Sequence, residues 1–158
     1  MNIEIHPKQP IRIELPSRVE FLNLVQGIAE EIAQVCGMPE DERLDFGLAV
    51  REGAINAMKH AHGFNPGLPV ALEFALDQNR TTLSVSILDQ GNGFDPATVS
   101  DPTAPENLLK SSGRGLLLIR SLVDEFDVLN HEGGTELVLV KKIGALRDDE
   151  SAHGGDDV

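Results

Sequence analysis

The stretch VALEFALDQNRTTLSVSILD, residues 70–89, contains two short runs in which every second residue is apolar. The alternating apolar positions are Val70, Leu72, Phe74 and Leu76 in the first run, and Leu83, Val85 and Ile87 in the second. A period of two places these side chains on one face of a strand, and the polar residues 77–80 form a turn between the strands. The stretch therefore predicts a β-hairpin with one face that other elements must cover.

Two helical segments precede this hairpin and supply the cover. Apolar residues recur at helical spacing from Phe21 to Val35, and Ser17 with Glu20 matches a capping box, so we expect Ser17 to cap the first helix. Pro39 is followed by three acidic residues, which favours a second helix start, and helical character continues to about residue 62.

The remaining segments complete the predicted fold. In Ile11–Leu15 apolar and charged residues alternate, and a proline stands on either side, which is typical of an edge strand. Apolar residues return to helical spacing over residues 116–123. Residues 126–129 and 135–141 are typical of strands. Residues 91–113 have no clear period and predict a functional loop or lid. The expected fold is α+β, a two-layer sandwich with helices on one face of a mixed, mainly antiparallel sheet. We expect one domain over residues 1–143 and a disordered acidic tail over 144–158.

Composition excludes several function classes. The 158 residues include 26 Asp plus Glu against 13 Lys plus Arg, a formal charge of -13 that disfavours direct contact with nucleic acid or anionic lipid. The single cysteine, Cys36, forms neither an internal disulfide nor a thiolate zinc site. Without a long apolar run, the chain is expected to avoid the membrane and to be cytoplasmic.

The second predicted helix carries a polar stripe. Glu52 and Asn56 are four residues apart, and Lys59 and His60 follow within another turn, so all four lie near one face. A carboxylate beside a carboxamide suits Mg²⁺, or a base next to a metal ligand. The alternative is an exposed face with a Glu/Lys pair.

Two glycine-containing segments suggest a nucleotide. Asp89 ends an apolar strand, where a carboxylate needs a donor such as a purine amino group, and Gly91 and Gly93 let backbone approach a flat base. The alternative for this loop is a tight turn with an Asp cap. Gly113 and Gly115 open a helix, where free N–H groups attract phosphate, with Arg114 as a further contact. The alternative there is a helix start capped by Ser111 or Ser112.

Taken together, these segments resemble a known ATP-binding family. EGAINAMKHAH (52–62), DQGNGFDP (89–96) and SSGRGLLLIRSL (111–122) are similar to the N, G1 and G2 boxes of the ATPase fold shared by gyrase B, Hsp90, histidine kinases and MutL. The brief lid and the stretch PENLLKSSGRGLLLIRSLVDEFDV resemble the anti-sigma factor serine/threonine kinases of the RsbW and SpoIIAB type. The similarity covers roughly residues 11–142.

The resemblance implies a role for each matched residue. Glu52 corresponds to the general base, Asn56 to the Mg²⁺ ligand and Asp89 to the adenine-reading carboxylate. The full set expected to bind ATP is Asn56, Lys59, His60, Asp89, Gly91, Gly93, Gly113, Arg114, Gly115, Leu116 and Thr135. Gly53 stands where the family often has alanine, and because glycine weakens a helix, it suggests close packing.

The resemblance also implies a reaction and partners. ATP would phosphorylate a serine or threonine of a STAS-type anti-anti-sigma factor, a sigma factor would compete for the kinase, and the chain would form a homodimer. A non-catalytic ATP-binding module that sequesters a regulator is the alternative, and retention of Glu52 favours the enzyme. A third alternative, the detached catalytic half of a histidine kinase, is less favoured than these two, because no phosphoacceptor helix pair precedes the domain.

Overall fold

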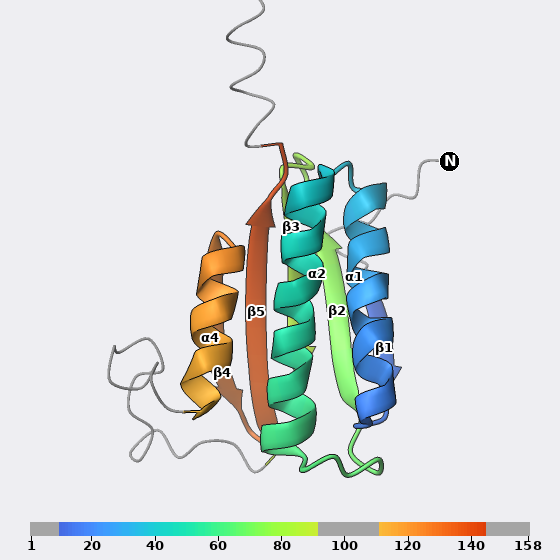
Figure 1. The fold of residues 1–158 in the computed structure, drawn as a ribbon, viewed down its shortest axis with the longest axis vertical. Helices are drawn as coiled ribbons and strands as arrows, with labels where there is room; N and C mark the ends of the chain where they lie inside the picture. The colour runs from blue at the N-terminus through green and yellow to red at the C-terminus, as the bar shows by residue number, and fades with distance from the viewer. Residues whose placement is uncertain (1–9, 92–110, 145–158) are drawn as a thin grey trace, which may run out of the picture.

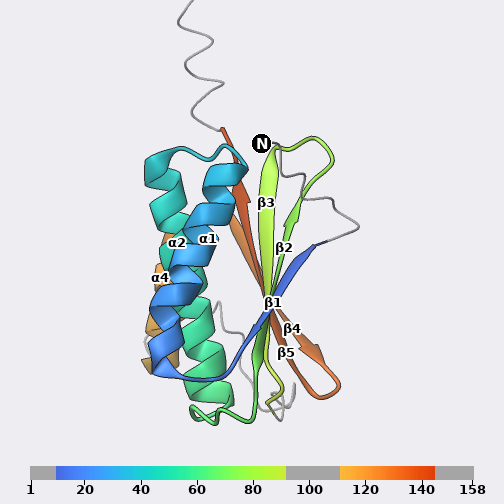
Figure 2. The same cartoon turned by 90° about the vertical axis from the view of Figure 1, so that its right-hand side faces the viewer.

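The computed structural model describes residues 10–91 and 111–144, which form two layers (Figures 1 and 2). In chain order the elements are β1 (Ile11–Leu15), the short 3₁₀ turn η1 (Val19–Phe21), α1 (Leu22–Val35), α2 (Glu40–Ile55), the π-helical turn η2 (Asn56–Ala61), β2 (Val70–Leu76), β3 (Thr82–Leu88), α4 (Ser111–Leu122), β4 (Glu125–His131) and β5 (Gly134–Lys142). The predicted α+β class is confirmed. Residues 145–158 of the predicted acidic tail and most of the predicted lid lie outside the described residues.

The five strands form one sheet in the order β1-β2-β3-β5-β4, and every pairing among the described residues is antiparallel. The register aligns the apolar positions, with Phe74 opposite Val85 and Ile87 opposite Leu137. Because alternate residues share a face, these pairs form one continuous apolar surface. The predicted hairpin of residues 70–88 is therefore the centre of the sheet.

All three helices cover this apolar surface, with α2 between α1 and α4 (Figures 1 and 2). The centre of the core consists of Phe46, Ala49 and Val50 from α2 against Phe74, Val85 and Leu139 from the sheet, all fully buried. Gly53 completes the close fit, because a methyl group at this position would overlap Cδ1 of Ile87. The expectation of close packing at Gly53 is confirmed.

The first helix begins later than the sequence suggested. α1 starts at Leu22 after η1, and neither start has a side-chain cap, so the predicted capping box at Ser17 is wrong. Ser17 is fully buried, and its hydroxyl bonds to His62 and to the carbonyl of Leu68. Residues 45 and 51 positions away along the chain provide these partners, so the local spacing could not reveal them.

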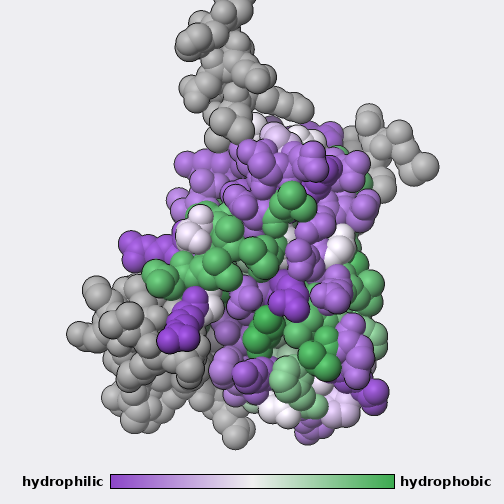
Figure 3. Space-filling model, viewed as in Figure 1, coloured by the Kyte–Doolittle hydropathy of each residue, from purple (hydrophilic) through white to green (hydrophobic). Residues whose placement is uncertain are grey.

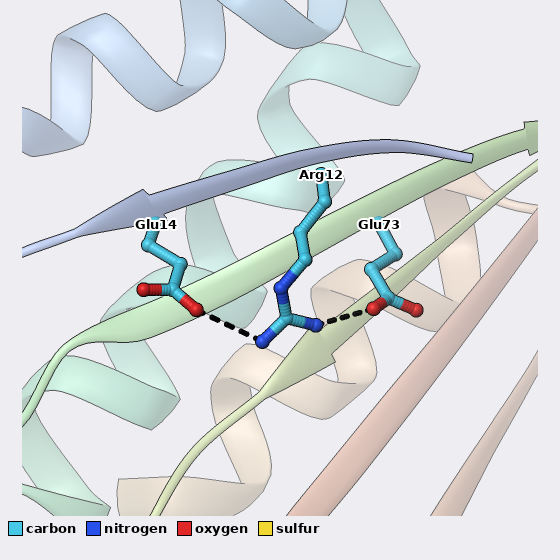
Figure 4. A network of polar contacts seen from close by, with 3 residues as sticks. All are labelled: Arg12, Glu14 and Glu73. Atoms are coloured by element: carbon cyan, nitrogen blue, oxygen red, sulfur yellow. Dashed lines mark hydrogen bonds and ion pairs between the residues drawn. The ribbon is translucent and has the colours of Figure 1, made fainter. Parts of the chain in front are cut away.

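The other face of the sheet is free of helices in the described part of the chain. There Arg12 on β1 forms ion pairs with Glu14 on the same strand and with Glu73 on β2 (Figure 4). These side chains are 33–56 % exposed, so the pairs contribute little stability. No helix within residues 10–91 and 111–144 is both long and apolar enough to cross a bilayer.

Candidate nucleotide-binding site

The predicted base and metal ligand lie where α2 changes its winding. Glu52 is in the last turn of α2, and Asn56 is the first residue of the π-helical turn η2. π-Helical turns are rare and occur often at functional sites. The buried residues Gly53, Ala54, Ala57 and Met58 hold this segment against the sheet. Both polar side chains are half-buried.

Gly115 brings the third motif to these two side chains. A methyl group added to Gly115 would lie 3.2 Å from Oδ1 of Asn56 and 3.6 Å from Oε2 of Glu52. A carboxylate oxygen and a carboxamide oxygen therefore face the same small space beside α4. Oxygen donors of this kind fit Mg²⁺, which usually takes few protein ligands and completes its shell with water and phosphate.

The start of α4 differs from the expected one. The helix begins at Ser111, not at Leu116, so Gly113 is within its first turn. By helix geometry the N–H of Gly115 bonds to the carbonyl of Ser111, whereas the N–H of Gly113 is among those without a helical partner. The small size of Gly115, not a free N–H, is then its contribution to the site.

Asp89 ends β3 and is held by the start of β5. Its Oδ1 accepts hydrogen bonds from the N–H groups of Gly91 and Thr135, both at 3.1 Å, and its own N–H donates to the Thr135 carbonyl at 2.9 Å. The bond to Gly91 is the tight-turn arrangement that the sequence left open. Among the described residues no donor bonds to Oδ2.

Thr135 is buried, and the glycine before it is a site residue that the sequence analysis missed. A methyl group at Gly134 would overlap the carbonyl oxygen of Asp89 and lie 3.0 Å from its carbonyl carbon. Only glycine permits β5 to approach the Asp89 loop this closely. The sequence Gly-Gly-Thr at residues 133–135 is compatible with a close approach of two backbones, but it indicates a simple turn equally well.

His62 is the second residue that the sequence analysis did not identify. It is 5 % exposed, and its Nε2 accepts a hydrogen bond from the N–H of Gln90 at 2.7 Å. No spacing rule connects residues 62 and 90, so the sequence contained no usable signal.

The remaining predicted residues are not all brought together. Lys59 and His60 are exposed at the end of η2, and Arg114 is exposed on α4, whereas Leu116 is half-buried. Gly93 lies outside the described residues. Within the described ranges, no cluster of three His, Cys, Asp or Glu side chains could hold a metal alone.

Known proteins resemble this chain over most of its length. The model of the histidine kinase-like ATPase domain matches residues 15–141. The chain is 30% identical over 134 residues to the serine-protein kinase RsbW of Bacillus subtilis (strain 168), covering 79% of this chain and 81% of the relative. It is 26% identical over 136 residues to RsbW of Bacillus cereus (strain AH820), covering 82% and 83%.

Solved structures share the fold at lower identity. The RsbU and RsbW domains of a Mycobacterium tuberculosis protein superpose with a TM-score of 0.61 at 20% identity, covering 85% of this chain and 32% of that one. A chain of the SiaB–SiaC complex from Pseudomonas aeruginosa superposes with a TM-score of 0.61 at 15% identity. The match covers 84% of this chain and 88% of that one. The chain belongs to the histidine kinase-like ATPase domain family, and within it to the ATP-using serine/threonine kinases of the RsbW anti-sigma factor type.

Proposed function

We propose that this chain transfers the γ-phosphoryl group of ATP to a serine or threonine of a STAS-type anti-anti-sigma factor, and that it sequesters a sigma factor in the same partner switch. One observation carries the proposal. Glu52 and Asn56 present oxygens to a common space beside Gly115, while the start of β5 holds Asp89 in place at the end of β3. We assign to these three residues the roles of general base, cation ligand and adenine-reading carboxylate, respectively.

Each of these residues has a distinct chemical task. Asp89 would accept a hydrogen bond from the adenine amino group, and the first turn of α4 would direct N–H groups to the phosphates. Glu52 would accept the proton of the attacking hydroxyl. Mg²⁺ held by Asn56 would neutralise phosphate charge in a chain whose own net charge is -13. Phosphoryl transfer depends mainly on positioning and charge neutralisation, which these groups supply.

The helical face is the surface we expect partner proteins to use. Exposed apolar side chains occur on all three helices and lie among polar residues on this face (Figure 3): they are Leu24 and Val35 on α1, Leu44 on α2 and Leu117 on α4. Apolar anchors on a chain whose net charge is -13 suit a protein partner better than a nucleic acid or a membrane. The homodimer and the cytoplasmic location remain part of this proposal.

The test replaces Glu52 by an isosteric neutral residue. Glu52→Gln removes the base but keeps the shape, so phosphorylation of the STAS protein should slow by about 10²–10⁴-fold while ATP still binds. Glu40→Gln, an exposed position on the same helix, is the matched control and should retain the wild-type rate. Asp89→Asn should weaken ATP binding, because the amide replaces an acceptor by a donor.

The measurements are transfer of radiolabelled phosphate to the host's STAS proteins and calorimetry with Mg²⁺-ATP. A Glu52→Gln variant that phosphorylates at the wild-type rate would refute the assigned base. A wild-type protein that binds ATP but labels none of these proteins would favour the non-catalytic module instead.

A further inference from the structure

His62 is held at a fixed position by the end of the helix that carries the predicted base and metal ligand. The chain reverses directly after it, where Gly63 has φ 56° and its N–H bonds to the Lys59 carbonyl at 3.0 Å. A glycine in the left-handed region with such a return bond is a common helix ending. The imidazole is thereby directed into the protein, where it is 5 % exposed.

The imidazole connects the Asp89 loop to the start of the chain. Its Nε2 accepts from the Gln90 N–H at 2.7 Å, and its Nδ1 lies 2.9 Å from the Ser17 hydroxyl. Ser17 in turn donates to the Leu68 carbonyl at 2.6 Å. Three segments that are far apart in the sequence therefore meet at one ring.

The partners determine where the protons lie. The carbonyl of Leu68 only accepts, so the single hydroxyl proton of Ser17 must go to it. The Ser17 oxygen must then accept from Nδ1–H of His62, and Nε2 must be bare to accept from the Gln90 N–H. All polar groups in this series of hydrogen bonds, from Leu68 to Gln90, are satisfied only when His62 is neutral with its proton on Nδ1. The ring is thus a directional link and not a general space filler.

The predicted nucleotide-binding loop, residues 89–91, is held by hydrogen bonds from two directions, one to β5 and one to His62. Asp89 is held by Thr135 on one side, and the next residue, Gln90, is held by His62 on the other. A hydrogen bond that fixes a loop before the ligand arrives lowers the entropy cost of binding. If the bond to Gln90 is lost, the ligand must order the loop when it binds, and its affinity falls by that entropy cost.

We propose that His62 is a positioning residue for the nucleotide, which as the neutral Nδ1–H tautomer holds residues 89–91 in the conformation that presents Asp89 to adenine. This inference rests on the proposed ATP site. It adds a determinant of nucleotide affinity that does not contact the nucleotide and lies outside the predicted set of ATP-binding residues.

Two amide variants separate the two ends of the link. The carbonyl oxygen of glutamine reaches about as far as Nε2, so His62→Gln keeps the acceptor for Gln90. Asparagine is shorter and reaches only as far as Nδ1, so His62→Asn keeps the bond to Ser17 and loses the one to Gln90. We expect the Asn variant to bind Mg²⁺-ATP about tenfold more weakly than wild type, and the Gln variant to stay within about threefold.

Calorimetry with Mg²⁺-ATP and thermal melting without nucleotide are measured for the full chain and both variants. A purely structural role would lower the melting temperature without separating the two variants in affinity. Glu40→Gln, the exposed position at the start of α2, is the control and should not change ATP affinity. In the wild type, ¹⁵N-edited NMR of the imidazole should report a protonated Nδ1 and a bare Nε2.

The outcomes separate this inference from the proposed function. Wild-type protein that binds ATP, with Asn and Gln variants that bind equally well, overturns the role of His62 and leaves the ATP site intact. A proton on Nε2 in the NMR spectrum also overturns it. Wild-type protein that does not bind ATP overturns the proposed function and, with it, the positioning role.

Discussion

Replacing Gly134 by alanine places a methyl group against the backbone of Asp89. The added Cβ would overlap the Asp89 carbonyl oxygen and lie 3.0 Å from its carbonyl carbon. Rotation of a side chain cannot relieve a clash with backbone, so β5 and the Asp89 loop must separate. Separation breaks the bond from the Thr135 N–H to Oδ1 at 3.1 Å and the bond from the Asp89 N–H to the Thr135 carbonyl at 2.9 Å.

The size of the effect follows from these two bonds. A bond to a charged acceptor contributes roughly 2 kcal/mol and a bond between neutral groups about 1 kcal/mol, so Gly134→Ala should lower the free energy of unfolding by about 3 kcal/mol. For a domain of this size that corresponds to a decrease in melting temperature of roughly 10 °C. ATP affinity should fall at least about tenfold, because Asp89 is no longer held in position.

Two other glycines provide controls for this substitution. Gly133 has φ 89° but no atom within 4 Å of an added Cβ, so Gly133→Ala should cost only backbone strain, about 1 kcal/mol. Gly27 in α1 also has open space, and Gly27→Ala should stabilise the protein by up to about 1 kcal/mol. The assays are urea unfolding and Mg²⁺-ATP calorimetry. If Gly134→Ala matched Gly133→Ala in both unfolding free energy and ATP affinity, the close approach of Gly134 to the Asp89 backbone would be refuted.

Two further substitutions test packing and charge. Gly53→Ala should lower the free energy of unfolding by about 1–2 kcal/mol in urea melts, because overlap with Ile87 outweighs the gain in helix propensity; an unchanged or higher stability would contradict this. Burial raises the pKa of the Glu42 carboxyl against the opposing charge of Lys141, and among the described residues no donor bonds to its buried Oε2. A raised folded-state pKa favours folding at low pH and opposes it once the carboxyl ionises. Glu42→Gln should therefore stabilise the protein by about 0.5 kcal/mol at pH 7 after allowance for solvent screening, and this gain should disappear below about pH 4. Urea melts at the two pH values check this, and a loss of stability at pH 7 would contradict it.

Local patterns predicted the elements better than their ends. The alternation in residues 70–88 predicted both central strands, because period two has only one structural solution when a single face is apolar. The start of α1 was misplaced because a serine followed by a glutamate at capping spacing is compatible with a cap, whereas burial directed Ser17 to His62 and Leu68. The end of a helix depends on what its terminal groups meet, which is not local information.

The sequence by itself predicted the sheet-and-helix pattern and, through three short motifs, Glu52 as the general base and Asn56, Asp89 and the glycines as residues expected to bind ATP. Tertiary structure alone decided how these residues are held. Gly134 is needed because β5 approaches the Asp89 loop. His62 is oriented because Ser17 and Gln90 bond to its ring, and Ser17 is itself fixed by the Leu68 carbonyl. Such convergence depends on the relative placement of distant segments, and a directional hydrogen bond forms only when that placement is correct to within a fraction of an ångström.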